Sequence, residues 1–148
     1  MGGEPSGRES DELVAVRALA FGARVLERAL DDMTLPQFRV LTLIASSPER
    51  ASRVAEKAAV SRPSLTGLLD GLEARGWVRR VEVDGDRRGV GLEVTPEGRA
   101  ALRTAERATA ARLELVLEQL PVDERRAVLD GLDALGGAFA TLRATAAP

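Results

Sequence analysis

The segment that decides the fold runs from Arg53 to Thr95 and reads RVAEKAAVSRPSLTGLLDGLEARGWVRRVEVDGDRRGVGLEVT. Its first half has the apolar spacing of two short helices joined by a turn at Val60, which is the pattern of a helix-turn-helix. The inner-face residues are Val54, Ala55, Ala58 and Ala59 in the first helix and Leu65, Leu68, Leu69 and Leu72 in the second. Small residues in the first helix predict that the two helices cross closely.

Local signals mark both ends of the second helix. Ser61 is a good N-cap, and Pro63 falls in the first turn, where its missing N–H breaks no helical hydrogen bond. We therefore expect the helix to begin at about Arg62. Gly76 stands where a C′ glycine ends a helix.

A hairpin follows this helix. Trp77 to Val83 alternates as a strand does, and Asp84-Gly85 is a hairpin-turn dipeptide. A second strand is expected from Val90 to Val94, with Asp86, Arg87 and Arg88 at the tip. A helix-turn-helix followed by a hairpin with a basic tip predicts a winged helix.

At these residues the chain resembles the multiple-antibiotic-resistance regulator (MarR) family of bacterial transcription factors. The most specific part is LEARGWVRRVEVDGDRRGVGLEVTPEG, residues Leu72 to Gly98, and the organisation matches from about Leu13 to Leu142. The resemblance implies a mainly α fold with a small β-hairpin wing (α+β), in which N- and C-terminal dimerisation helices flank the winged helix. It also implies a homodimeric repressor that binds a pseudo-palindromic operator and is relieved by a small aromatic or anionic effector.

Charge and composition narrow the function classes. The 148 residues carry a net charge of −2, but Arg50 to Arg99 holds ten basic and eight acidic residues, so this segment carries +2 and the rest of the chain −4. The basic excess therefore lies where DNA would bind. Cysteine and histidine are absent, which excludes disulfides, thiol sensing, Cys/His metal sites and imidazole catalysis. We expect no enzyme activity, no metal and no cofactor.

The chain has the length of one domain. We expect a disordered tail over residues 1–11 and a single domain over 12–148, with residues 34–98 as the DNA-binding part and residues 12–31 and 99–145 as the dimerisation part. No apolar run reaches the roughly 18 residues of a membrane span, and the N-terminus lacks a signal pattern, so a cytoplasmic location is expected.

Four further helices are expected outside the helix-turn-helix. Ser10 or Asp11 caps one that runs to about Leu30, and Thr34 caps one that ends at Ser47-Pro48. Thr95-Pro96-Glu97 opens a long helix to about Leu120, and the last spans about Asp123 to Arg143.

Three of these helices carry an apolar stripe at heptad-like spacing. The stripes allow two interpretations: a helical core within one chain, or an interface with a second subunit. The second is favoured, because a chain of this size offers little else to cover them. The expected interface residues are Val16, Leu19, Leu113, Val116, Leu132, Leu135, Phe139 and Leu142.

DNA contacts are expected from the start of the recognition helix and from the wing. The helix candidates are Ser61, Arg62, Ser64, Leu65 and Thr66. For two of them a structural role is an alternative: Ser61 as a helix cap without a DNA contact, and Leu65 as a core residue. In the family the residue two after the wing aspartate enters the minor groove, which implies Arg88 here, held by Asp86, beside Arg87. Weaker candidates are Arg39, Arg53 and Arg80.

Two glycines depart from the family pattern. Many members have basic residues where this chain has Gly67 and Gly71, so each glycine is expected to replace a phosphate contact. We therefore expect weaker DNA binding and a flatter salt dependence than is usual in the family. The alternative function is a dimeric ligand-binding or adaptor protein whose winged helix does not bind DNA.

An effector site is implied by the resemblance, between the winged helix and the dimerisation helices. The candidate residues are Arg17, Phe21, Arg24, Met33, Phe38 and Arg112, each of which has core packing or a solvated charge as its simpler interpretation.

Overall fold

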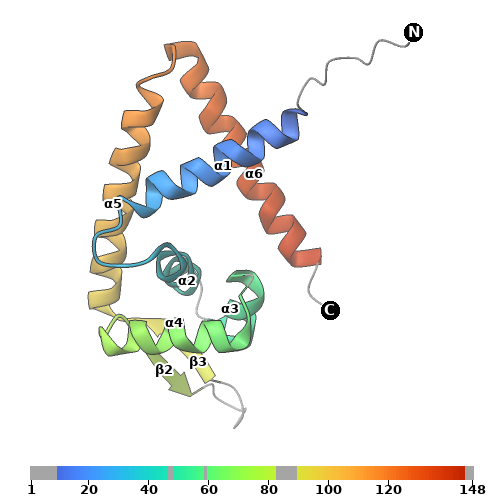
Figure 1. Ribbon diagram of the computed structural model, residues 1–148. Helices are drawn as coiled ribbons and strands as arrows, with labels where there is room; N and C mark the ends of the chain where they lie inside the picture. Colours follow the sequence, from blue (N-terminus) through green and yellow to red (C-terminus); the bar gives the residue numbers. More distant parts are fainter. Residues whose placement is uncertain (1–9, 47–48, 59, 83–89, 146–148) are drawn as a thin grey trace.

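The computed structural model describes residues 10–46, 49–58, 60–82 and 90–145. Its elements, in chain order, are α1 (Asp11–Glu27), α2 (Leu35–Ser46), β1 (Glu49–Arg50), α3 (Ala51–Ala58), α4 (Arg62–Ala74), β2 (Val78–Glu82), β3 (Val90–Val94), α5 (Pro96–Leu117) and α6 (Val122–Thr145). The winged helix of α2 to β3 lies at the bottom of Figure 1, and α5 rises from it to a turn from which α6 descends. The predicted winged helix flanked by terminal helices is confirmed.

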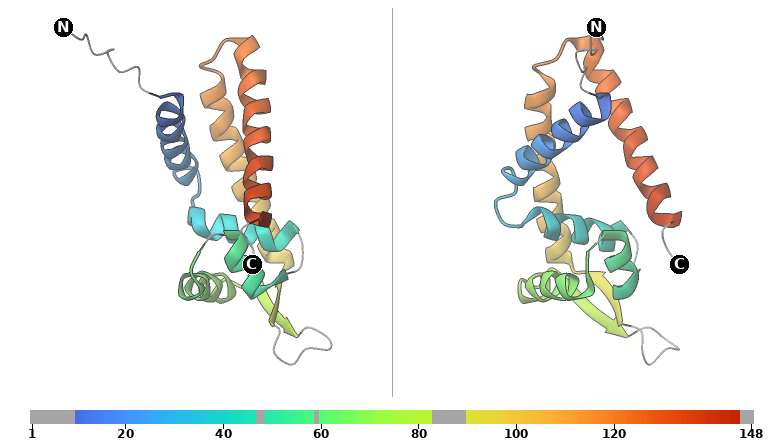
Figure 2. Two further views of the ribbon diagram at one scale, coloured as in Figure 1. Left: turned by 90° about the vertical axis from the view of Figure 1, so that its right-hand side faces the viewer. Right: turned by 45° about the vertical axis from the view of Figure 1, so that its right-hand side comes forward.

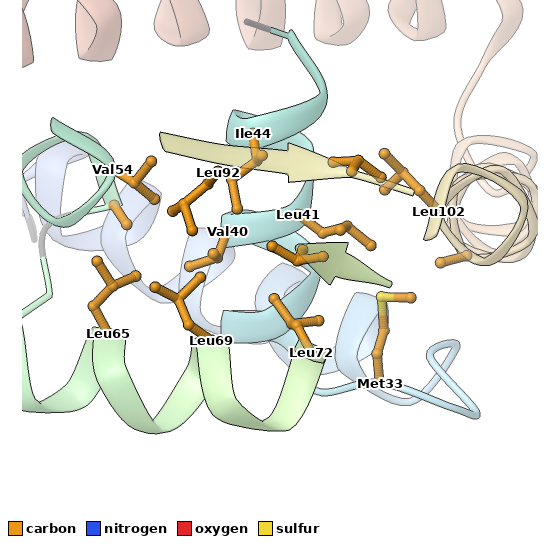
Figure 3. Close-up of a cluster of buried hydrophobic side chains, with 14 of the residues drawn as sticks. Met33, Val40, Leu41, Ile44, Val54, Leu65, Leu69, Leu72, Leu92 and Leu102 are labelled. Atoms are coloured by element: carbon orange, nitrogen blue, oxygen red, sulfur yellow. The ribbon is translucent and has the colours of Figure 1, made fainter. Parts of the chain in front are cut away.

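One hydrophobic core holds the winged helix together. Leu41 of α2, Leu72 of α4 and Leu92 of β3 are each 0% exposed, and side chains from α3 and α5 complete the cluster around them (Figure 3). Because α2, α3, β2, β3 and α5 all contribute to this cluster together with α4, the position of α4 is determined by packing on several sides.

The sheet contains the predicted hairpin and one further strand. Strands β2 and β3 pair antiparallel from Val78 opposite Val94 to Glu82 opposite Val90. The short β1, which the sequence pattern did not predict, pairs with the other edge of β3. The predicted turn at Asp84-Gly85 lies outside the described residues.

The predicted helix boundaries of the winged helix are confirmed by their caps. The backbone N–H of Ser64 donates to the Ser61 hydroxyl at 3.2 Å, and Gly76 has a φ of 69° after the end of α4. Thr34 and Gln37 form a reciprocal capping box at the start of α2, with distances of 3.3 Å and 3.0 Å. Short polar side chains therefore satisfy the free N–H groups at these helix starts.

Two predicted helices were too long at their C-terminal ends. Helix α1 ends at Glu27 instead of Leu30, because the chain turns so that Leu30, only 9% exposed, enters the winged-helix core. Helix α5 ends at Leu117 instead of Leu120. There the Arg125 side chain donates to the carbonyl of Leu120 at 3.0 Å, which helps to hold a tight turn before α6.

The outer helices leave their apolar stripes uncovered. Neither α1 nor α6 contains a buried residue among those described. Helix α1 packs against α5, and the right view of Figure 2 shows that α1 and α6 run in different directions. The interpretation of the stripes as a core within one chain is therefore wrong.

In the part of the chain that the structure describes, no helix combines the length and the hydropathy needed to cross a membrane.

Candidate nucleic-acid interface

Helix α4 presents one face to the core and the opposite face to solvent. Leu65, Leu69 and Leu72 are at most 4% exposed, whereas Gly67 and Asp70 lie on the exposed side. Leu65 is thus a core residue, and its inclusion among the DNA contacts is wrong, because helical periodicity turns it away from the open face. Anchoring by three leucines gives the exposed face a defined orientation.

The first turn of α4 carries an exposed cation at the positive end of the helix dipole. Arg62 is exposed and makes no ion pair within the described residues. The hydroxyls of Ser61 and Ser64 bond to each other at 2.8 Å, and the Thr66 hydroxyl donates to the Arg62 carbonyl at 3.1 Å. These hydroxyls retain acceptor capacity, so a DNA donor could still bond to them. The helix start itself favours an anion such as a phosphate.

Two arginines of β2 are paired with carboxylates. Arg80 bonds to Glu73 and to Asp70 of α4, both at 3.0 Å. Arg79 is held by Glu93 of β3, with the closer nitrogen at 2.6 Å. Arg80 was expected to be a DNA cation, but it sits instead between two acids and joins the wing strand to the recognition helix. Its attraction for phosphate is correspondingly reduced.

The two glycines of α4 have different surroundings. A Cβ on Gly67 would meet nothing within 4 Å, so this position is open to an approaching molecule. A Cβ on Gly71 would lie 3.1 Å from the side-chain nitrogen of Gln37 in α2. The expectation that each glycine replaces a phosphate contact is therefore unsupported at Gly71, which faces a neighbouring helix.

The remaining DNA candidates lie apart from α4 or beyond what the structure describes. Arg53 of α3 and Arg39 of α2 are exposed. The wing-tip residues Asp86, Arg87 and Arg88 lie outside the described residues, so their assignment stays a prediction.

A cavity of about 150 Å³ lies between the α1–α2 connection, Trp77 and α5. Its lining residues are Ala29, Leu30, Asp31, Asp32, Met33, Trp77, Ala101, Thr104, Ala105 and Ala108. Met33 is the one effector candidate that lines it. The others do not: Phe38 packs against the core, and Phe21 on α1 is 74% exposed. Arg17, Arg24 and Arg112 are exposed on α1 and α5, away from this lining.

The sequence analysis did not predict the ion pairs of Arg80 with Asp70 and Glu73, nor the contribution of Trp77 to the cavity wall. Asp70 and Glu73 are three residues apart and so share one side of α4, while β2 starts immediately after the Gly76 turn. That spacing was a usable signal for an ion pair with one of the β2 arginines. The cavity had no such signal, since its lining comes from three segments far apart in the sequence.

Within the described ranges no group of acidic side chains is arranged to hold a metal ion.

Comparison with known proteins agrees with this architecture. The family model described as "MarR family" matches residues 31–89. The HTH-type transcriptional regulator YfiV of Bacillus subtilis (strain 168) is 36% identical over 109 residues, covering 73% of this chain and 68% of that protein.

Two solved structures extend the similarity to most of the chain. The transcriptional repressor CouR, bound to a 23-mer DNA duplex, is 28% identical with a TM-score of 0.76, and the alignment covers 91% of this chain and 99% of CouR. A MarR family protein of Mycobacterium tuberculosis in complex with salicylic acid is 25% identical with a TM-score of 0.73, covering 88% and 99% of the two chains. From the winged helix, its capped recognition helix and these relatives, we conclude that the chain belongs to the MarR family of winged helix-turn-helix transcription regulators.

Proposed function

We propose that the protein is a homodimeric repressor that binds a pseudo-palindromic operator through α4 and the wing, and that a small aromatic ligand weakens this binding. The observation that carries the proposal is the exposed first turn of α4. There Arg62 lies exposed at the positive end of the helix dipole, on a helix held by Leu65, Leu69 and Leu72. An arginine in this position can bond to a guanine edge in the major groove or to a phosphate.

The dimer is supported by the uncovered stripes. Val16 is 59% exposed, Phe139 45% and Leu142 65%, although their spacing is that of buried positions. Exposed apolar stripes of this kind are typical of interaction sites. A second copy would cover the exposed stripes within residues 12–31 and 99–145, which leaves residues 34–98 to bind DNA. Two recognition helices related by a two-fold axis would then read an inverted repeat with half-sites about one helical turn apart.

The effector part of the proposal is supported by the cavity beside α5. Its lining offers an indole ring and small aliphatic side chains, and a related protein binds salicylic acid. Two lining residues, Asp31 and Asp32, are acidic, and no lining residue is basic. A neutral aromatic molecule therefore suits the cavity better than an anion. A ligand that prefers the conformation unable to bind DNA would lower DNA affinity by that preference.

DNA binding is tested by fluorescence anisotropy on duplex from upstream of the protein's own gene, with random duplex as competitor. Loss of one good base-edge contact costs roughly 1–3 kcal/mol, so Arg62→Ala should lower operator affinity by about 5- to 150-fold. The matched control is Arg126→Ala, which removes the same charge from α6, far from α4 in Figure 1. Equal affinity of both variants for the operator would contradict the assignment of α4.

The salt dependence of DNA affinity tests how many arginine and lysine side chains contact phosphates. Each phosphate contact contributes about 0.9 to the slope of log affinity against log salt. Because Arg79 and Arg80 are already paired with acids, we expect a shallow slope. Replacing both Asp70 and Glu73 by Asn and Gln should free Arg80 and steepen it. An unchanged slope in that variant would show that Arg80 does not reach the backbone.

The alternative, an adaptor whose winged helix does not bind DNA, is favoured by the exposed Gly67 and by the Asp70 carboxylate beside it on α4. Neither residue offers a cation at the centre of the recognition helix. Binding that is absent from a range of operator candidates, or equal on random duplex, would support this alternative. Binding that resists random competitor would exclude it.

A further inference from the structure

Trp77 lies where the recognition helix, the wing and the long helix α5 meet. Its backbone N–H donates to the Leu72 carbonyl of α4 at 2.9 Å, and its carbonyl accepts from the Thr95 N–H, at the start of α5, at 3.0 Å. The Thr95 hydroxyl also donates to the Gly76 carbonyl at 2.6 Å. A Cβ on Gly98 would fall 2.1 Å from the Trp77 carbonyl oxygen, so the first turn of α5 rests directly on this peptide. These bonds hold the Trp77 backbone between the end of α4 and the start of α5, whereas its indole ring is contacted separately by Arg75.

Arg75 joins this junction to the connection between α1 and α2. It is the C-cap residue of α4, and its guanidinium lies 4.5 Å from the centre of the Trp77 ring. The same guanidinium donates to the backbone carbonyl of Asp32. Stacking on an indole while donating in the plane of the group is a combination that arginine allows and lysine does not.

The two partners of Arg75 are also two walls of the cavity. Trp77, whose ring Arg75 contacts, and Asp32, whose carbonyl accepts from Arg75, both line the cavity. A molecule that fills the cavity would contact Trp77 and the α1–α2 connection, which are the two parts that the Arg75 guanidinium joins. The last turn of the recognition helix is thus one side chain away from the cavity.

We propose that Arg75 is the positioning residue through which the cavity and the recognition helix influence each other. The inference rests on the proposed function, in which α4 binds DNA, and adds the residue that connects α4 to the effector site. By linkage, DNA bound to α4 changes the affinity of the cavity for its ligand by the same factor as that ligand changes the affinity for DNA, and we expect this coupling to alter the cavity wall when DNA binds. The effect at the wall can therefore be observed without knowing the effector.

Trp77 provides the readout, because it is the only tryptophan of the chain. We would measure acrylamide quenching of its fluorescence in the full-length protein, with and without saturating operator duplex, and follow binding of the same samples by anisotropy. The quenching constant should change by at least about 1.5-fold on DNA binding. In Arg75→Ala and Arg75→Lys this change should disappear while DNA is still bound, and in Arg126→Ala it should persist.

The outcomes separate a coupling role from a merely structural one. If Arg75 only stabilises the fold, Arg75→Ala will lower the melting temperature, yet Trp77 will still respond to DNA, and the proposal is overturned. An unchanged quenching constant in the wild-type complex overturns it as well. Absence of operator binding by the wild type contradicts the proposed function instead.

A second measurement does not depend on DNA. Ala108→Leu places a larger side chain in the cavity from α5, and hydrogen exchange over residues 72–77 reports the end of α4. We expect Ala108→Leu to change this exchange in the wild-type background and to have no effect in the Arg75→Ala background. Equal effects in the two backgrounds would show that the cavity reaches α4 without Arg75.

Discussion

The winged helix and the outer helices use similar apolar residues with opposite results. In the winged helix, Leu41, Leu72 and Leu92 are completely buried. In the outer helices, Leu19 and Leu132 are 43% and 41% exposed despite an equally regular spacing. The difference lies in the partners that the chain provides. The winged helix folds back on itself through three helices and a sheet, whereas the described part of the chain buries no residue of α1 or α6.

The comparison teaches that an apolar stripe specifies burial but not the molecule that supplies it. Burial of one large apolar side chain contributes about 1.5–3 kcal/mol, so a chain that leaves many such side chains exposed gains substantially from a second copy. Four sets of substitutions would break or sharpen this comparison.

The largest effect is expected from charges on the α6 stripe. Leu132→Arg combined with Phe139→Arg removes four apolar side chains from a two-fold interface, which at about 1.5 kcal/mol each should weaken subunit association by roughly ten-thousand-fold. Sedimentation velocity over a range of concentrations would measure it. The control is Gly137→Arg, on the side of α6 opposite the stripe, where a Cβ meets nothing within 4 Å. A double variant that remains dimeric would place the interface elsewhere.

Truncation of a leucine in each region compares the two kinds of burial directly. Leu72→Ala leaves a hole in a closed core and should lower the free energy of unfolding by about 2–5 kcal/mol. The Leu142 side chain is 65% exposed in one chain. When Leu142→Ala is added to the monomeric Leu132→Arg, Phe139→Arg variant, the free energy of unfolding in urea should therefore fall far less. Equal losses there would mean that the end of α6 is buried within its own chain.

A smaller effect is expected at the contact between α5 and Trp77. In Gly98→Ala the new methyl group would meet the Trp77 carbonyl oxygen, so the first turn of α5 must shift, at a cost of about 1–3 kcal/mol. The same substitution at Gly22 in α1, where a Cβ meets nothing within 4 Å, should be stabilising. Thermal unfolding of the two variants would show opposite shifts, and a neutral Gly98→Ala would argue against the close approach.

The smallest effect separates the two glycines of α4. Gly67→Ala should raise the free energy of unfolding by about 0.5–1 kcal/mol, because alanine loses less backbone entropy and the position is open. Gly71→Ala should gain less, since Gln37 must move by a few tenths of an ångström. Chemical denaturation would resolve the order of the two variants, and the reverse order would show that Gly71 is not packed against α2.

Much of the winged helix could be predicted because its boundaries depend on local chemistry. Ser61, Thr95 and Gly76 act within a few residues of their own position, so the ends they mark are where the sequence pattern put them. The ends of α1 and α5 were placed three residues too far. There the chain stops being helical because Leu30 is drawn into a distant core and Arg125 holds the α5–α6 turn, which are contacts between separate elements.

The candidate site divides in the same way. Arg62 at the start of α4 and the orientation of Leu65 both follow from helical periodicity. The neutralisation of Arg80 by Asp70 and Glu73, and the role of Gln37 beside Gly71, depend on how β2 and α2 pack against α4. A helical pattern shows which residues share a face but not which element will lie against that face.

The sequence by itself determined the kind of protein: the caps, the turn glycine and the apolar spacing specify a winged helix between long helices, and its relatives place it in the MarR family. Only the tertiary structure decided which charges are free and where a cavity lies. The reason is the distance along the sequence over which each kind of interaction acts. Caps and helical faces act over three or four residues, whereas Arg75 meets Asp32 across 43 positions and the cavity collects its walls from three separate segments.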